Sequence, residues 1–252
     1  MAEEDFQVIT AKEQEGLADV AIGITSPVWP EFMRHDPIVS ANWRRLYEDF
    51  PQYQFVLKES GSGAIVAVAN SLPVVWERSY RELPDHGLDW AFEQTFAEIS
   101  SGKPFSVLCA AAIAIPVEYR GKGISTRAVQ EMLNLARAHD LKGLIAPVRP
   151  NLKCLYPTIP AERYIEWKDE NGLPFDPWMR VHAKLGATIV KVCRRSMIIK
   201  GTVSEWESWA GMKFPEEGHY VVPGALTTVE IERDKGTYME PNVWMVHARE
   251  ES

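Results

Sequence analysis

Residues 107–126 read VLCAAAIAIPVEYRGKGIST, and this stretch decides the fold class. Small and β-branched residues at 107–117 predict a buried strand that bends near Pro116. Residues 126–139 place apolar side chains at helical spacing, and 144–148 form another short apolar strand. The order is therefore strand, glycine-rich basic loop, helix, strand, which indicates an α/β protein.

The loop Arg120-Gly121-Lys122-Gly123 precedes the first turn of the predicted helix. Such a turn carries unpaired N–H groups and the positive end of the helix dipole. Glycine lets the backbone approach a ligand, and the two cations add positive charge. The loop is therefore a candidate site for a phosphate or pyrophosphate, with a plain helix start and solvated cations as the alternative. It lacks the P-loop pattern, and Thr126 replaces the third glycine of a Rossmann fingerprint.

The strand and loop resemble the acyl-CoA-binding signature of the GNAT acyltransferase superfamily, which is written [QR]xxGx[GA]. Arg120 and Gly123 match it, whereas Ser125 stands at its final glycine or alanine. The segment HAKLGA at 182–187 resembles the family's helix-to-strand ending Tyr-x-Lys-x-Gly-Phe. The resemblance implies an α+β fold with a mixed, mostly antiparallel central sheet. We expect that sheet to be splayed between two strands and flanked by helices.

We expect a GNAT-like domain over residues 1–200, with an aromatic and proline-rich insertion at 152–176. Residues 201–252 are expected to form a C-terminal β-rich extension packed on the same domain. Further segments predict a helix over 38–50 and strands over 188–193 and 196–199. Ser204 and Glu207 have the spacing of a capping box.

The chain carries 27 Lys and Arg against 35 Asp and Glu, a net charge of −8. This balance disfavours a nucleic-acid binder and docking on an anionic membrane. Residues 118–153 alone hold seven Lys and Arg against three Asp and Glu, a local charge of +4, which leaves −12 for the rest. The basic island lies where the resemblance places the CoA phosphates, and the acidic remainder favours a cationic amine.

The cysteines, the longest apolar stretches and residues 1–5 indicate where in the cell the protein is expected. Cys109, Cys154 and Cys193 are odd in number and far apart, so neither a disulfide framework nor a structural zinc or other metal site is expected. No apolar stretch approaches the ~20 residues that span a bilayer. Residues 1–5 are acidic and show no signal peptide, so a cytoplasmic location is expected.

The resemblance implies an acyl-CoA co-substrate, acetyl-CoA or another. Its pyrophosphate is expected on the loop amides, and its pantetheine arm beside the splayed strand. The implied contacts in this sequence are Ile115, Val117, Arg120, Gly121, Lys122, Gly123, Ile124, Ser125, Thr126 and Asn151. Asn151 is equally well explained as a turn residue that ends a strand.

The implied reaction moves an acetyl or longer acyl group from acyl-CoA to an amine of a small molecule by direct aminolysis. A backbone N–H of the splayed strand can stabilise the oxyanion. His182 occupies the position of the family's acidic tyrosine, and its ordinary pKa of ~6.5 suits an acid or a base. Candidate bases are Glu162, Glu166 and Asp176, with water-mediated proton transfer as the alternative. Cys154 as a ping-pong nucleophile lacks a His/Asp context.

Aromatic residues predict a roomy apolar acceptor or acyl site formed by Trp29, Phe32, Tyr156, Tyr164 and Trp167. Two other functions stay open: a non-catalytic GNAT-like acyl-CoA-binding or regulatory module, and a protein lysine acetyltransferase. The long insertion is expected to cover the acceptor cleft, which disfavours the second. The expected partners are acyl-CoA and a small-molecule amine acceptor. Neither nucleic acid nor a membrane is an expected partner, and the sequence leaves open whether the protein forms a homodimer.

Overall fold

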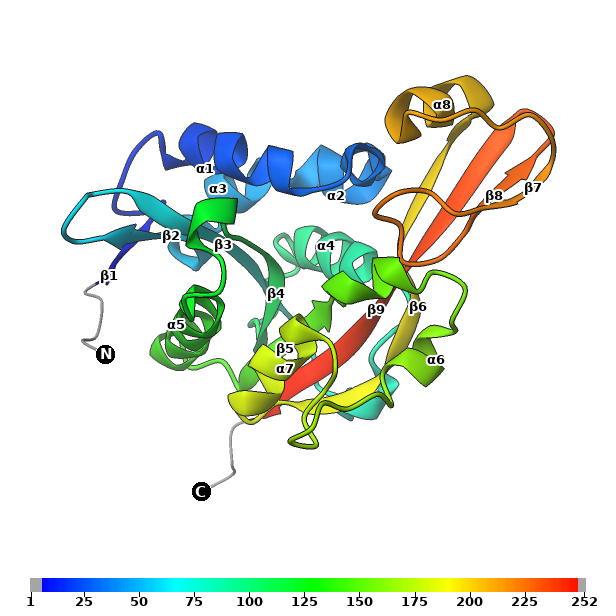
Figure 1. Ribbon diagram of the computed structural model, residues 1–252. Helices are drawn as coiled ribbons and strands as arrows, with labels where there is room; N and C mark the ends of the chain where they lie inside the picture. Colours follow the sequence, from blue (N-terminus) through cyan, green and yellow to red (C-terminus); the bar gives the residue numbers. More distant parts are fainter. Residues whose placement is uncertain (1–5, 249–252) are drawn as a thin grey trace.

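The computed structural model describes residues 6–248 (Figure 1). Residues 1–5, on which the signal-peptide prediction rests, and residues 249–252 lie outside this part of the chain. A mixed sheet runs through the molecule and confirms the predicted fold class. Its N-terminal strands are antiparallel neighbours in chain order: β1 (Phe6–Thr10), β2 (Gln54–Glu59), β3 (Ile65–Val74) and β4 (Val107–Ala114).

The sheet divides between β4 and the parallel strand β5 (Gly143–Val148). The two strands pair only at Leu108 with Leu144 and at Cys109 with Ile145. Beyond these pairs β4 continues beside β3, whereas β5 follows β9 (Lys235–Ala248). The predicted splay is therefore present, and it opens between the carboxyl ends of β4 and β5.

Helices cover both faces of the sheet. One face packs against α1 (Leu17–Thr25), α2 (Pro37–Asn42), α3 (Arg45–Asp49) and α4 (Gly87–Glu98). The other packs against α5 (Ile124–Ala138) and α7 (Pro177–Lys184). Side chains alternate across β2: Val56 belongs to the core under α1–α4, whereas Phe55 and Leu57 belong to the core under α5. The strand is buried on both faces because helices lie on both.

The last strand enters the interior of the sheet. β9 is antiparallel both to β5 and to β6 (Thr188–Thr202). The C-terminal end of β6 and the N-terminal end of β9 form a lobe at the upper right of Figure 1. The lobe also contains α8 (Val203–Ala210), β7 (Gly218–Tyr220) and β8 (Val229–Glu232). The boundary expected at residue 200, between the GNAT-like domain and the C-terminal extension, falls within β6. Strand β9 of the expected extension belongs to the same sheet as β1–β5.

Two local expectations need correction. The helix expected over 38–50 is divided into α2 and α3, because the N–H groups of Leu46 and Tyr47 bond to carbonyls three residues back, those of Trp43 and Arg44. The strands expected over 188–193 and 196–199 are one strand, β6, whose pairing with β9 shifts register between Cys193 and Met197.

Two boundaries also differ from expectation. The strand expected over 107–117 ends at Ala114, and a short 3₁₀ turn, Val117–Tyr119, follows Pro116. The capping box of α8 consists of Thr202 and Glu205, not Ser204 and Glu207. The N–H of Glu205 donates to Thr202 Oγ1 at 3.2 Å, and Glu205 Oε2 accepts from the N–H of Thr202 at 2.7 Å. The cap lies where β6 ends.

Within residues 6–248, no helix is both long enough and apolar enough to cross a membrane.

Candidate active site

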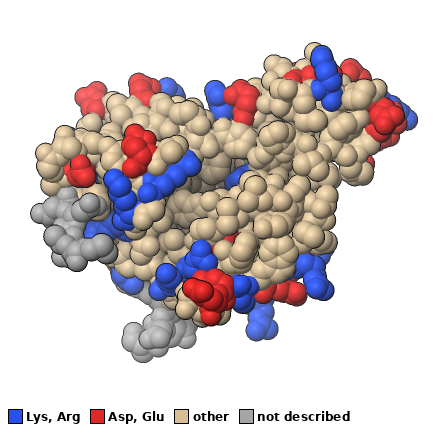
Figure 2. Space-filling view, viewed as in Figure 1, with Lys and Arg blue, Asp and Glu red and all other residues tan. Residues whose placement is uncertain are grey.

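A cavity of about 660 Å³ lies at the opening between β4 and β5. It extends from the glycine-rich loop, past the ends of both strands, to β9 and the helices on the opposite face. Figure 2 shows the molecule hollowed across its middle, with Lys and Arg side chains gathered at the left rim. The cavity walls are mainly apolar and include Val28, Met33, Val39, Trp43, Leu88, Ala111, Ile113, Pro147, Trp178, Val181 and Met197.

The glycine-rich loop has the geometry of an anion site. Gly121 and Gly123 have φ of 78° and 79°, and a Cβ on either would meet no atom within 4 Å. The glycines are therefore needed for their backbone conformation, and the space beside them is open. Within residues 6–248 no acceptor is recorded for the N–H groups of residues 121–125. Arg120 Nε donates to the carbonyl of Ile115 at 3.1 Å, which fastens the loop to the strand end.

Most of the expected CoA contacts lie along this cavity. The lining residues among them are Ile115, Arg120, Gly121, Gly123, Ile124, Ser125 and Asn151. Val117, Lys122 and Thr126 do not line it. Val117 is 72% exposed in the 3₁₀ turn rather than in a strand, and the Lys122 ammonium lies 5.4 Å from the centre of the Tyr119 ring.

His182 lines the cavity from α7 and is almost fully buried. Its Nδ1 lies 2.9 Å from Nε2 of His247, whose Nδ1 lies 3.3 Å from the carbonyl of Leu185. Because a carbonyl only accepts, His247 carries its proton on Nδ1, and its Nε2 accepts from His182 Nδ1. His182 Nε2 is therefore left as an acceptor.

Burial, and then the neighbouring His247, lower the pKa of His182 to about 3. The ring is neutral at physiological pH and holds no proton on Nε2. An acid role in the resting state, which its ordinary pKa would allow, does not fit this environment. An accepting role does.

The three carboxylates considered as bases lie outside the cavity lining. Glu162 forms a surface ion pair with Arg194 at 2.6 Å, and Glu166 lies exposed beside Arg163. Asp176 is buried as the N-cap of α7. It accepts from the N–H groups of Trp178 and Met179, and also from the Leu152 N–H and the Tyr164 hydroxyl. These hydrogen bonds give Asp176 a structural role.

The predicted aromatic site is only partly assembled. Trp29 lines the cavity, whereas Phe32 is 1% exposed between Trp206 and Tyr238. Tyr156, Tyr164 and Trp167 do not line the cavity. They pack on one another and on Phe175, with ring centroids 4.9–6.2 Å apart. The insertion at 152–176 thus has an aromatic core of its own.

Cys154 also lies outside the cavity lining, and its Sγ donates to the carbonyl of Asn151 at 3.1 Å. No group of three or more His, Cys, Asp or Glu side chains suited to a metal ion occurs among residues 6–248.

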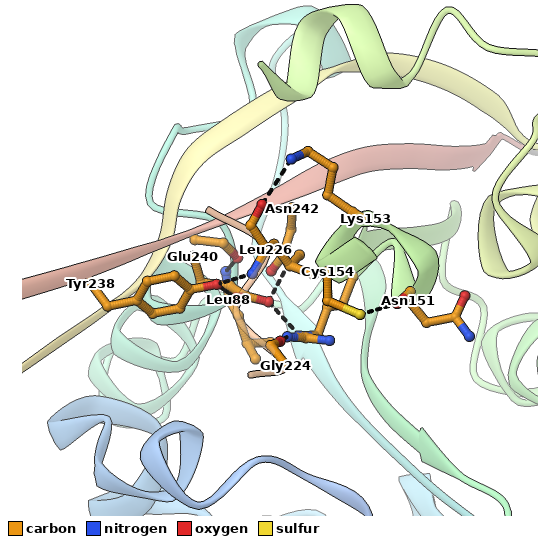
Figure 3. Close-up of polar contacts among 11 residues, drawn as sticks. Leu88, Asn151, Lys153, Cys154, Gly224, Leu226, Tyr238, Glu240 and Asn242 are labelled. Carbon is orange, nitrogen blue, oxygen red and sulfur yellow. Dashed lines mark hydrogen bonds and ion pairs between the residues drawn. The ribbon is translucent and has the colours of Figure 1, made fainter. Parts of the chain in front are cut away.

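A polar cluster that the sequence reasoning missed lies at the β9 end of the cavity (Figure 3). Glu240 is completely buried, and its Oε1 lies 2.5 Å from Arg149 Nε. The Tyr238 hydroxyl donates to the other carboxylate oxygen, and Asn242 Nδ2 lies 3.3 Å from Oε1. Arg149, Glu240 and Asn242 all line the cavity. The signal in the sequence is the run YMEPNVW at 238–244, which places a carboxylate among aromatic residues at every second position of a strand.

Known proteins are similar to this chain in sequence and in fold. The chain is 28% identical to the arginine N-acetyltransferase avaD of Aspergillus versicolor, over 88% of this chain and 86% of the relative. No model of a known protein family matches the chain.

Solved structures share the fold, and two of them are described here. One is the loading GNATL domain of CurA from Lyngbya majuscula, with a TM-score of 0.61, 17% identity and coverage of 97% of this chain and 98% of that one. The other is the GphF GNAT-like decarboxylase in complex with isobutyryl-CoA, with a TM-score of 0.57, 14% identity and the same coverage. The divided sheet and its loop thus have the GNAT-like fold that the sequence resemblance implied, and the chain is similar in sequence to an N-acetyltransferase.

Proposed function

We propose that the protein transfers an acetyl or longer acyl group from acyl-CoA to the amine of a small molecule by direct aminolysis of the thioester. The observation that carries the proposal is the continuous cavity. It connects the anion-binding loop at the start of α5, through the opening between β4 and β5, with the polar cluster at β9. A donor and an acceptor entering from opposite faces would meet inside the divided sheet.

The donor side follows from backbone geometry. The free N–H groups of residues 121–125 and the positive end of α5 would bind the CoA pyrophosphate. Among residues 6–248, the edge of β4 that faces β5 pairs with no strand after Cys109. Backbone groups on that edge can pair with the pantetheine amides, and an N–H there can stabilise the tetrahedral oxyanion.

His182 would act as an acceptor rather than an acid. Its neutral ring and unprotonated Nε2 can accept a hydrogen bond from the attacking amine, which orients the nitrogen lone pair toward the thioester. A pKa of about 3 makes the ring a weak base, so the amine proton leaves through water. The thiolate formed from CoA is then protonated by solvent, a modest demand because its ordinary pKa is ~8.5.

The name of the curated relative suggests acetyl-CoA as donor and arginine as acceptor. The test measures CoA release with acetyl-, propionyl- and isobutyryl-CoA against a panel of amines: arginine, ornithine, a polyamine, an arylalkylamine and a lysine-containing peptide. Mass spectrometry identifies the product. We expect turnover with a small-molecule amine. Tight CoA binding with no turnover on any amine would indicate a binding module, and turnover on the peptide alone would indicate a protein acetyltransferase.

A further inference from the structure

Arg149 directly follows β5 and is held from two sides. Its Nε lies 2.5 Å from Glu240 Oε1, and its Nη2 donates to the carbonyl of Gly224 at 2.6 Å. The side chain is 16% exposed and lines the cavity. The guanidinium is therefore fixed in orientation by a strand and by the loop that precedes β8.

A count of donors shows what the guanidinium still offers. Arginine has five N–H groups: the bond to Gly224 uses one, and Nε lies in the ion pair with Glu240 without forming a hydrogen bond. No further acceptor for Arg149 is recorded among residues 6–248. Three N–H groups on the two terminal nitrogens remain, and this end of the fork matches the two oxygens of a carboxylate.

The surroundings select an anion for this position. Glu240 is completely buried and already holds Arg149, Asn242 and Tyr238, so it positions Arg149 and offers no exposed oxygen to a ligand. The other cations that line the cavity are Arg34, which is half exposed and paired with Glu31, and Arg120 at the phosphate loop. Arg149 is thus the most deeply buried of the lining cations.

The position also separates Arg149 from the donor. Glu240 and Tyr238 share a face of β9 with Trp244, and Tyr238 and Trp244 pack in the core under α1–α4. The glycine-rich loop directly precedes α5, and α5 covers the opposite face of the sheet. Arg149 therefore serves a ligand that enters from the side away from the CoA phosphates.

We infer that Arg149 binds a carboxylate of the acceptor, so that the acceptor is an amino acid or another amine that bears a carboxylate. This inference deepens the proposed function and rests on it. A carboxylate docked on the terminal nitrogens places an α-amine on the neighbouring carbon, inside the cavity and next to the opening of the sheet. Removing the acceptor carboxylate removes charge-assisted hydrogen bonds, which are worth about 10- to 100-fold in affinity.

The test compares each amino acid of a panel, arginine included, with its own amide and with the decarboxylated amine, at saturating acyl-CoA. We expect kcat/KM for the acid to exceed that for the amide about 10- to 100-fold, mainly through KM. Arg149→Gln should bring the ratio close to one. Because that variant leaves Glu240 buried without its partner, the charge-balanced variant Arg149→Gln/Glu240→Gln is measured too, with the same result expected. Arg44→Gln, on the surface beside Asp19, should leave the ratio unchanged.

Equal kcat/KM for acid and amide in the wild type would overturn the inference. So would an Arg149→Gln enzyme that loses activity on acid and amide by the same factor, because that pattern reports structure alone. If no amine is acylated, the proposed function fails separately. Binding of acid and amide to CoA-saturated protein is then followed by the fluorescence of Trp29 and Trp43, which line the cavity. Carboxylate-dependent binding that Arg149→Gln abolishes would still support the inference, and equal binding would overturn it.

Discussion

Replacement of Gly123 by alanine separates backbone strain from ligand binding. Gly123 is the N-cap of α5 with φ of 79°, and a Cβ there meets no atom within 4 Å. The folded protein therefore loses only the left-handed conformational preference, about 1–2 kcal/mol. For a domain of this size each kcal/mol lowers the melting temperature by about 2–4 °C. The added methyl group projects into the open space where the N–H groups of residues 121–125 would bind the CoA pyrophosphate.

Gly102 provides a matched control. It has φ of 70°, a Cβ there also meets no atom within 4 Å, and it lies in the turn between α4 and β4, outside the cavity lining. Gly102→Ala should cost the same stability as Gly123→Ala and should leave CoA binding unchanged. Gly123→Ala should weaken CoA binding about 10- to 100-fold, the equivalent of one charge-assisted hydrogen bond to phosphate.

Calorimetric titration with CoA measures the affinity, and thermal unfolding with and without CoA measures the stability. At a CoA concentration 100 times its Kd, the wild type and Gly102→Ala should gain about 2.7 kcal/mol of stability. Gly123→Ala should gain about 1.3–2.3 kcal/mol less at the same concentration, for a 10- to 100-fold loss of affinity. Equal CoA affinity in the two alanine variants would refute the assignment of the loop as the phosphate site.

Three further predictions concern buried polar groups. His182→Gln should lower kcat at least about tenfold with little change in CoA affinity. Because the pKa of His182 is about 3, this residue should cause no inflection near pH 6.5 in the pH profile of kcat/KM. The wild-type and variant profiles should therefore have the same shape in that range. Burial and the charge of Asp36 raise the pKa of Asp89 to about 8, so wild-type stability should fall between about pH 4 and 8, where the unfolded chain has lost that proton and the folded form still holds it. Asp89→Asn should flatten this decline in urea unfolding, and an unchanged pH slope would contradict it. Asp176→Ala should lower the free energy of unfolding by about 2–4 kcal/mol, because four donors lose their acceptor. Its KM values should stay the same, since Asp176 does not line the cavity.

Local sequence signals predicted the strand, the glycine-rich loop and the helix at one end of the cavity. The apolar run at 107–117, the two glycines of the loop and the amphipathic segment after it lie within 35 residues of one another, and their meaning depends on neighbours in the chain. Positive φ at Gly121 and Gly123 and the free N–H groups of the first helical turn follow from that local pattern. The splay followed from the family resemblance, and the pairing of β4 with β5 shows it.

The β9 end of the cavity depends on contacts between distant segments, which local patterns do not specify. Arg149 and Glu240 meet only because β9 pairs with β5, and nothing near residue 240 in the sequence names that neighbour. The aromatic residues of 152–176 were expected at the cavity, but Tyr156, Tyr164 and Trp167 bury their rings against one another. Aromatic composition alone does not indicate whether such rings line a cavity or pack on one another.

Turnover of acetyl-CoA with arginine tests the central claim most directly. The purified protein is incubated with both, CoA release is followed with a thiol reagent, and the acceptor is examined by mass spectrometry. We expect one acetylated arginine for each CoA released, with the loss of activity in Gly123→Ala overcome by high acetyl-CoA. Stable binding of acetyl-CoA without acylation of arginine or any other amine would contradict the claim that this cavity catalyses acyl transfer.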